Sequence, residues 1–295
     1  GGSIAESALA ESLKNKELPC PAAVMNALAN MNSQLAVNEY ILWASDLNVN
    51  TRASALNALA WSSSPLAYPV LSKAAKDVFY RWEVSGATAA FLDYANIAGQ
   101  NGDIKTMDRI CKLVISKSKD RLTIQNKARA LKTYVGFHGI DAWKELVKAA
   151  ENSDKIYRSA AYQATMQIPG NDFIARWIEY FPKAIPDAKP EIITMLGEAG
   201  DDSALPLINS SLSDADQRVR TEAVNALAKI SGSKAVPSLI EYMKNSSDKT
   251  DQEAAKTAFM TVAGNKEVAL LKPVLTEGSP AARQSTIEIM AWNRG

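Results

Sequence analysis

Residues with the chemistry for catalysis are few and scattered in this chain. Its 295 residues include one histidine, His138, and two cysteines, Cys20 and Cys111. A bound zinc ion needs three or four side-chain ligands, and a nucleophilic side chain needs a base beside it. His138 follows Phe137 near an expected helix end, where a capping or surface role is expected. The sequence therefore predicts no metal, no cofactor and no catalytic centre.

Motifs that bind phosphate groups are also missing from the sequence. There is neither a G-x-x-x-x-G-K-[ST] loop nor a G-x-G-x-x-G turn. No C-x-x-C pair occurs either. The acidic pair Asp201-Asp202 falls in a turn between expected helices, where carboxylates cap helix ends.

One segment is strongly basic. The chain as a whole has a net charge of +1, whereas residues 101–150 carry 11 basic and 5 acidic groups, a net charge of +6. Two interpretations stay open: a docking site for an acidic partner, or an ordinary solvated helix face. A nucleic-acid partner is not expected, because such proteins carry more basic surface. The basic residues are Lys117, Lys119, Arg121, Lys127, Arg129 and Lys132.

A repeat of about 31 residues must position these groups. Its clearest copy is the segment Val219–Leu227. Taking Arg220 as position zero, small or apolar residues stand at plus three, plus six and plus seven, which is one face of a helix. One interval, from Ser85 to Ala128, spans 43 residues. The position-zero residues are Pro21, Arg52, Ser85, Ala128, Arg158, Lys189, Arg220, Gln252 and Arg283.

A second amphipathic helix is expected after each motif helix, so the unit is a helical hairpin. Asp216 and Ser279 stand where N-caps are expected. Gly200 and Gly232 follow expected helix ends, as C-cap glycines do. Prolines stand near the start of the second helix, where a missing N–H costs least. These prolines are Pro206, Pro237 and Pro273.

The pattern Asp, two or three residues, Val-Arg, two residues, Ala, two residues, Ala-Leu resembles HEAT repeats of the short bacterial, PBS-lyase-like type. The resemblance spans roughly residues 5–292. It implies an all-α fold of the α–α superhelix class, an armadillo-type right-handed solenoid of about nine stacked helical hairpins. Ankyrin repeats are disfavoured, because they need a histidine in each repeat and the chain has one.

Catalytic members of this wider group carry features that are missing here. HEAT-type hydroxylases hold iron with repeated His-Glu pairs, and no such pair occurs in the sequence. HEAT-like DNA glycosylases use a basic concave face, whereas this chain is nearly neutral. The resemblance therefore implies a non-catalytic repeat protein.

Position plus five of the motif is polar in every copy except Ala90. In HEAT-like arrays the second helix of each hairpin lines the concave surface; this is the motif helix when the amphipathic helix before it is counted as the first. The resemblance therefore implies a polar ladder along an inner groove. The ladder suits a peptide or protein partner; alternatively, a crowded, half-exposed position simply requires short polar residues. The ladder residues are Asn26, Asn57, Thr133, Gln163, Thr194, Asn225, Thr257 and Glu288.

The domain organisation follows from the same repeat. Residues 1–3, Gly-Gly-Ser, look like a cloning remnant, and residues 4–295 are expected to form a single solenoid, irregular around 95–125 with a bend or seam there. No polar closing repeat follows Trp292, so the chain is expected to be truncated at its C-terminus. Cys20 and Cys111 lie about three repeats apart, too far for a disulfide. No apolar run is long enough to span a membrane.

Three functional hypotheses follow. The first is a non-catalytic scaffold that binds a protein or peptide partner through its concave surface. The second is an accessory domain of a larger secreted protein, because the chain is similar to HEAT segments of large Bacteroidetes proteins that can precede a jelly-roll domain described as a sugar hydrolase. That resemblance implies a periplasmic or secreted location. The third, an enzyme in its own right, lacks a supporting motif.

Overall fold

The computed structural model describes residues 2–292, and every regular element in that range is a helix. The all-α, α–α superhelix class predicted from the repeat is thus confirmed. Each of the nine motif copies belongs to a helix of its own. These motif helices are α2 (Pro21–Asn30), α4 (Val49–Trp61), α6 (Ala87–Gln100), α8 (Ile124–His138), α10 (Lys155–Thr165), α12 (Ala188–Ala199), α14 (Gln217–Ser231), α16 (Lys249–Val262) and α19 (Pro280–Trp292).

Connecting helices alternate with the motif helices, and α1 (Gly2–Ser12) precedes the first pair. Several of them begin with a short 3-10 turn and a proline, as at Pro206 and Pro237. The connecting helices are α3 (Val37–Trp43), α5 (Ala67–Asp77), α7 (Ile104–Lys117), α9 (Trp143–Ala150), α11 (Asp172–Tyr180), α13 (Leu205–Ser211), α15 (Val236–Asn245), α17 (Asn265–Val268) and α18 (Lys272–Glu277).

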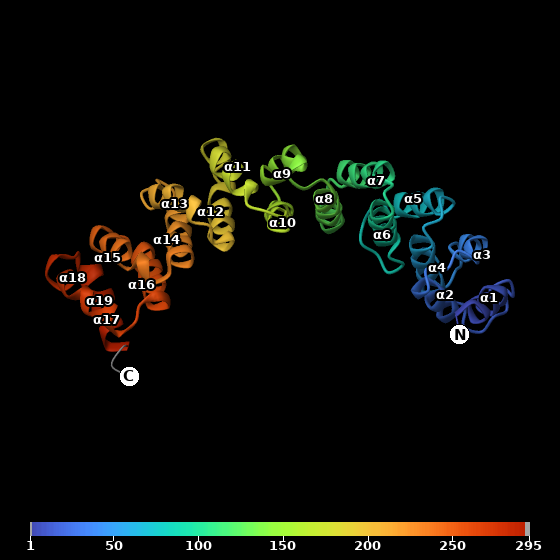
Figure 1. The fold of residues 1–295 in the computed structure, drawn as a ribbon, viewed down its shortest axis with the longest axis horizontal. Helices are drawn as coiled ribbons and strands as arrows, with labels where there is room; N and C mark the ends of the chain where they lie inside the picture. The colour runs from blue at the N-terminus through green and yellow to red at the C-terminus, as the bar shows by residue number, and fades with distance from the viewer. Residues whose placement is uncertain (1, 293–295) are drawn as a thin grey trace. The chain divides into compact units, whose positions relative to one another are not determined.

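The chain divides into two compact units: residues 1–167, called unit 1, and residues 168–295, called unit 2. Within each unit the motif helices form one layer, on the inner side of that unit's curve, and the connecting helices form the other (Figure 1). The division between the units follows Gln167, and a seam around 95–125 stays a prediction. The long interval is filled by α6 and α7, 14 residues each, and α7 packs against both α6 and α8, so the core continues there. That residues 4–295 form one continuous solenoid stays a prediction.

The motif register is confirmed by burial. In α14, Ala223 and Ala226 at plus three and plus six are almost fully buried, and Leu227 at plus seven is as well. The same positions are buried in the degenerate copy in α6, where Phe91 and Leu92 take them. Small residues at these positions let neighbouring motif helices approach closely, and the burial of apolar area stabilises the stack.

In several copies the residue at position zero holds the turn before its motif helix. The Nη1 atoms of Arg52, Arg158 and Arg220 each donate to the carbonyl oxygen six residues earlier, at 2.6, 2.9 and 2.9 Å. Gln252 does the same through Nε2, which lies 2.6 Å from the Ser246 carbonyl oxygen. An arginine with several donors in a fixed fork suits this role, so its recurrence has a structural cause.

The predicted helix caps are confirmed. The Asp216 carboxylate accepts a hydrogen bond from the Arg218 amide at 2.9 Å, and Ser279 Oγ accepts from the Ala282 amide at 3.1 Å. Gly200 ends α12 in the left-handed region, with φ of 70°. These contacts satisfy amide and carbonyl groups that a helix end leaves unpaired.

Two further features bear on the sequence predictions. Cys20 and Cys111 are both free thiols, as expected from their separation. Among the described helices, none combines the length and the apolar character needed to cross a lipid bilayer. Of the terminal segments singled out above, Gly1 and residues 293–295 lie outside the described residues.

Candidate binding surface of the motif helices

The polar residues at position plus five all keep contact with solvent. In unit 1, Asn26 and Gln163 are exposed, and Asn57 and Thr133 are half-buried. In unit 2, two residues are half-buried and two are exposed. The half-buried pair is Thr194 and Asn225, and the exposed pair is Thr257 and Glu288. Ala90, the apolar exception, is buried. The helical register thus turns this position away from the inter-repeat core.

Some ladder residues bind the neighbouring repeat. Lys132 Nζ donates to Gln163 Oε1 at 2.6 Å. Thr194 Oγ1 lies 3.0 Å from a carboxylate oxygen of Glu222, 28 residues further along the chain. These contacts join consecutive motif helices across the ladder and occupy part of its hydrogen-bonding capacity.

Glu288 accepts hydrogen bonds from Lys256 and Gln284. The other five ladder side chains are uncharged. Within residues 2–292 their side chains make no hydrogen bond to the rest of the protein. An asparagine amide offers two donors and one acceptor oxygen, and a threonine hydroxyl offers a donor and an acceptor. These groups are therefore available to a ligand. The five residues are Asn26, Asn57, Thr133, Asn225 and Thr257.

A cleft of 450 Å³ lies between α16 and α19, on the ladder side of unit 2. Thr257 and Glu288 of the ladder line it, together with Glu253 and Lys256. Lys256 Nζ lies 2.7 Å from a carboxylate oxygen of each glutamate. The hydrogen bonds that Lys256 donates to Glu253 and then to Glu288 raise the pKa of Lys256, so its ammonium group stays charged and links the two helices.

Three of the six residues of the basic segment are engaged within the protein. Lys127 stacks on the Tyr157 ring at 4.2 Å, Arg129 pairs with Asp93, and Lys132 binds the ladder. Burial, followed by repulsion from Lys148, lowers the pKa of Lys127. The remaining three residues are exposed, at the end of α7 and in the loop that follows it. They are Lys117, Lys119 and Arg121.

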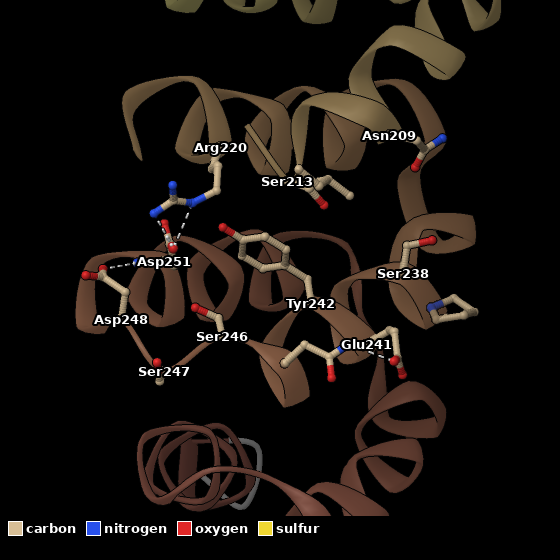
Figure 2. Close-up of a pocket in the computed structure, with 13 residues that line it drawn as sticks. Asn209, Ser213, Arg220, Ser238, Glu241, Tyr242, Ser246, Ser247, Asp248 and Asp251 are labelled. Carbon is tan, nitrogen blue, oxygen red and sulfur yellow. Dashed lines mark hydrogen bonds and ion pairs between the residues drawn. The ribbon is translucent and has the colours of Figure 1, made fainter. Parts of the chain in front are cut away.

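A second cavity, of 770 Å³, lies on the connecting-helix side of unit 2, between α13 and α15 (Figure 2). At its base, Arg220 Nε and Nη2 lie 3.0 and 2.9 Å from Asp251 Oδ2, and the Asp251 side chain is only 5% exposed. Figure 2 shows the Tyr242 hydroxyl turned toward this pair. Burial raises the pKa of Tyr242 to about 12, so the hydroxyl stays protonated. The sequence analysis did not single out Asp251; its one signal is its place 31 residues after Arg220.

The same groove recurs in unit 1. A cavity of 540 Å³ between α3 and α5 has Arg52, the equivalent of Arg220, in its lining. Such a recurrence indicates a groove between adjacent connecting helices, produced by the repeat, with the position-zero arginine at its base. In the described part of the chain, no three His, Cys, Asp or Glu side chains converge as metal ligands would.

His138 and Cys111 are structural residues. His138 lies at the end of α8, with Nε2 2.6 Å from Asp108 Oδ1 on α7, and its ring lies beside Tyr134. This histidine therefore joins two helices, a role that the expected capping or surface position did not include. Burial raises the pKa of Cys111 to about 12, so its thiol is protonated and unreactive.

Comparison with known proteins identifies the repeat. Residues 174–260, which extend from α11 into α16, match the family described as HEAT repeats. The fold is that of a HEAT/armadillo-type solenoid. No curated protein matches it. Folds built from HEAT repeats commonly mediate protein interactions and are generally non-catalytic.

Similar solved structures include a crystal structure of an engineered protein, with 16% identity, a TM-score of 0.38, and coverage of 97% of this chain and 88% of that chain. Human deoxyhypusine hydroxylase in complex with glycerol, an enzyme, has 14% identity and a TM-score of 0.35, covering 88% of this chain and 97% of that one. A computationally designed armadillo repeat protein for modular peptide recognition has 15% identity and a TM-score of 0.21, with coverage of 86% of this chain and 98% of that chain.

Proposed function

We propose that this HEAT-repeat protein binds an extended segment of a partner protein through the position-plus-five ladder of its motif helices. One observation supports this most strongly: five uncharged polar ladder side chains face solvent without a hydrogen bond to any other residue between 2 and 292. The other three ladder residues, Gln163, Thr194 and Glu288, bind neighbouring side chains, so the proposal depends on these five. Here the free residues are amides and hydroxyls, which can both donate and accept hydrogen bonds.

The chemistry of asparagine matches that of a peptide backbone. The amide oxygen of Asn57 or Asn225 can accept from a peptide N–H while its amide nitrogen donates to a peptide carbonyl oxygen. Packed helices lie about 8–10 Å apart, and an extended chain rises about 3.3 Å per residue. Ladder residues on successive motif helices would therefore contact about every second or third residue of a bound peptide.

A selection from a displayed library of unstructured peptides tests the proposal. Peptides enriched by the wild-type chain would be measured against Asn57→Ala for the ladder of unit 1 and Asn225→Ala for that of unit 2. Loss of a two-point hydrogen bond should weaken binding about fivefold to tenfold. Asn209→Ala is the matched control, because Asn209 is an exposed asparagine on connecting helix α13.

Each outcome bears on the proposal. Weaker binding to one ladder variant, with unchanged binding to the Asn209 variant, would support it and identify the unit that holds the peptide. Equal affinity for all three variants, or no enrichment at all, would refute it. Circular dichroism would show that each variant keeps its helices.

A further inference from the structure

Exposed apolar side chains gather at one edge of unit 1, away from the ladder. In the loop between α5 and α6, Phe79 is 70% exposed, Trp82 74% and Val84 73%. Leu122, in the loop between α7 and α8, is 62% exposed. We call these four residues the apolar edge. A contiguous exposed group of large apolar side chains marks an interaction site in a soluble protein.

The two loops are held side by side. Arg81 Nη2 lies 3.2 Å from Asp120 Oδ2, which pairs one loop with the other. Asn126 Nδ2 donates to the Tyr80 carbonyl oxygen at 2.9 Å, which fixes the first loop to α8. Since Asn126 is buried, this hydrogen bond is protected from water. The apolar edge is thus a surface of defined geometry rather than two independent loops.

The backbone of the first loop is strained. Phe79 and Tyr80 have φ of 54° and 59°, in the left-handed region that bulky residues rarely adopt. Tyr80 is buried and anchors the turn, whereas Phe79 projects outward. Strained backbone persists where the surrounding structure holds it, often at binding sites. The strain here has the effect of displaying an aromatic ring to solvent.

The edge is rimmed by positive charge. Lys119 and Arg121 flank Leu122 along the chain, both are exposed, and neither forms an ion pair within residues 2–292. The nearby carboxylates are already engaged. Asp120 pairs with Arg81, and Glu83 accepts from the Ser85 and Ala87 amides at 2.7 and 2.9 Å. The exposed charge beside the apolar side chains is therefore positive.

Unit 2 offers an internal comparison. The loops that precede α14 and α16 occupy the same place in the repeat, but residues 213–216 read Ser-Asp-Ala-Asp and residues 246–248 read Ser-Ser-Asp. These loops are polar and acidic. Exposed apolar and basic residues are therefore a property of these two loops of unit 1 and not a requirement of the repeat.

We infer that the apolar edge of unit 1 docks onto an anionic lipid surface. Trp82 and Phe79 would lie at the headgroup level, where aromatic side chains are favoured. Lys119 and Arg121 would face anionic headgroups, and an apolar anchor joined to basic residues gives the two signals that stable membrane attachment needs. The apolar side chains stand on loop tips rather than in a groove, which suits insertion into a soft interface. This inference uses none of the ladder residues and is independent of the proposed function.

The test is co-sedimentation of the whole chain with vesicles of phosphatidylcholine alone or mixed with phosphatidylserine. The wild type should bind only the mixed vesicles, and less so as salt screens the charges. Two variants remove one signal each: Phe79→Asn with Trp82→Ser, and Lys119→Gln with Arg121→Gln. Asparagine tolerates the left-handed backbone at position 79. The affinity of each variant for the mixed vesicles should fall at least about tenfold.

Matched controls lie in unit 2. Leu270→Ser with Ile287→Ser removes two exposed apolar residues, and Lys234→Gln with Lys266→Gln removes two exposed cations. Both should bind the mixed vesicles like the wild type. Circular dichroism would verify that every variant is folded.

Three results would overturn the inference. The first is no sedimentation with the anionic vesicles, and the second is equal sedimentation of edge and control variants. The third is an edge-dependent contact with protein instead of lipid. A dimer in light scattering that Phe79→Asn with Trp82→Ser dissociates would show self-association. Edge-dependent retention on immobilised polyglutamate without vesicle binding would show an acidic protein partner.

Discussion

At the scale of single residues, the repeat encodes two different roles that the sequence alone did not separate. Position zero faces the preceding turn, where Arg52, Arg158 and Arg220 bind backbone carbonyl oxygens. Position plus five faces solvent. Both are polar and recur at the same period, so periodicity predicted their register. It did not show that one is structural and the other is free.

The Arg220–Asp251 pair should contribute far more stability than the neighbouring pairs of Arg218. Asp251 is almost buried, so Arg220→Ala would leave a buried carboxylate unpaired and should lower the free energy of unfolding by about 3 kcal/mol. Arg218 pairs with Asp187 and Asp216 at exposed positions, where water screens the charges. Arg218→Ala should therefore have a much smaller effect in denaturant unfolding. Similar losses in the two variants would contradict this assignment.

At the scale of helices, much of the fold could be predicted. Small and apolar residues at plus three, plus six and plus seven located all nine motif helices, including the degenerate copies in α6 and α8. The reason is that burial depends on the apolar face and tolerates Phe91 or Leu131 where several other copies have alanine. Caps such as Asp216 were predictable because their role is local.

The loops could not be predicted in the same way. Nothing in the local sequence required Phe79 and Tyr80 to adopt a left-handed backbone conformation. The pairing of Arg81 with Asp120, which lies 39 residues further along the chain, was equally absent from the local pattern. The boundary between the units after Gln167 was not predictable either, because the repeat period is regular across it and irregular elsewhere. Such features depend on tertiary contacts that single-sequence patterns do not encode.

Close packing of α12 against α14 gives a test at this scale. A Cβ on Gly197 would lie 2.8 Å from the Ala226 Cα atom. Gly197→Ala gains about 1 kcal/mol of helix propensity, but overpacking against backbone costs about 1–3 kcal/mol, so the variant should be less stable. Gly136→Ala is the control, since no atom lies within 4 Å of the added Cβ. It should be neutral or stabilising in thermal unfolding; stabilisation by both changes would refute the close approach.

At the scale of the molecule, each unit is a stack in which a hairpin contacts its neighbours, so stability comes from successive interfaces. Packing between hairpins alone accounts for the residues that recur at positions plus three, plus six and plus seven. Because the repeat places a short polar side chain at the same position of successive motif helices, these side chains form a row along the motif-helix layer of each unit. The proposed function follows from that row, whereas the apolar edge is a separate property of unit 1.

The most direct test of the central claim is amide hydrogen exchange of the wild-type chain with and without a peptide enriched in the selection. Binding should slow exchange in the motif helices of one unit, around Asn57 or around Asn225, and leave the connecting helices unchanged. Protection confined to connecting helices α13 and α15, beside the cavity of Figure 2, would contradict the ladder as the binding surface.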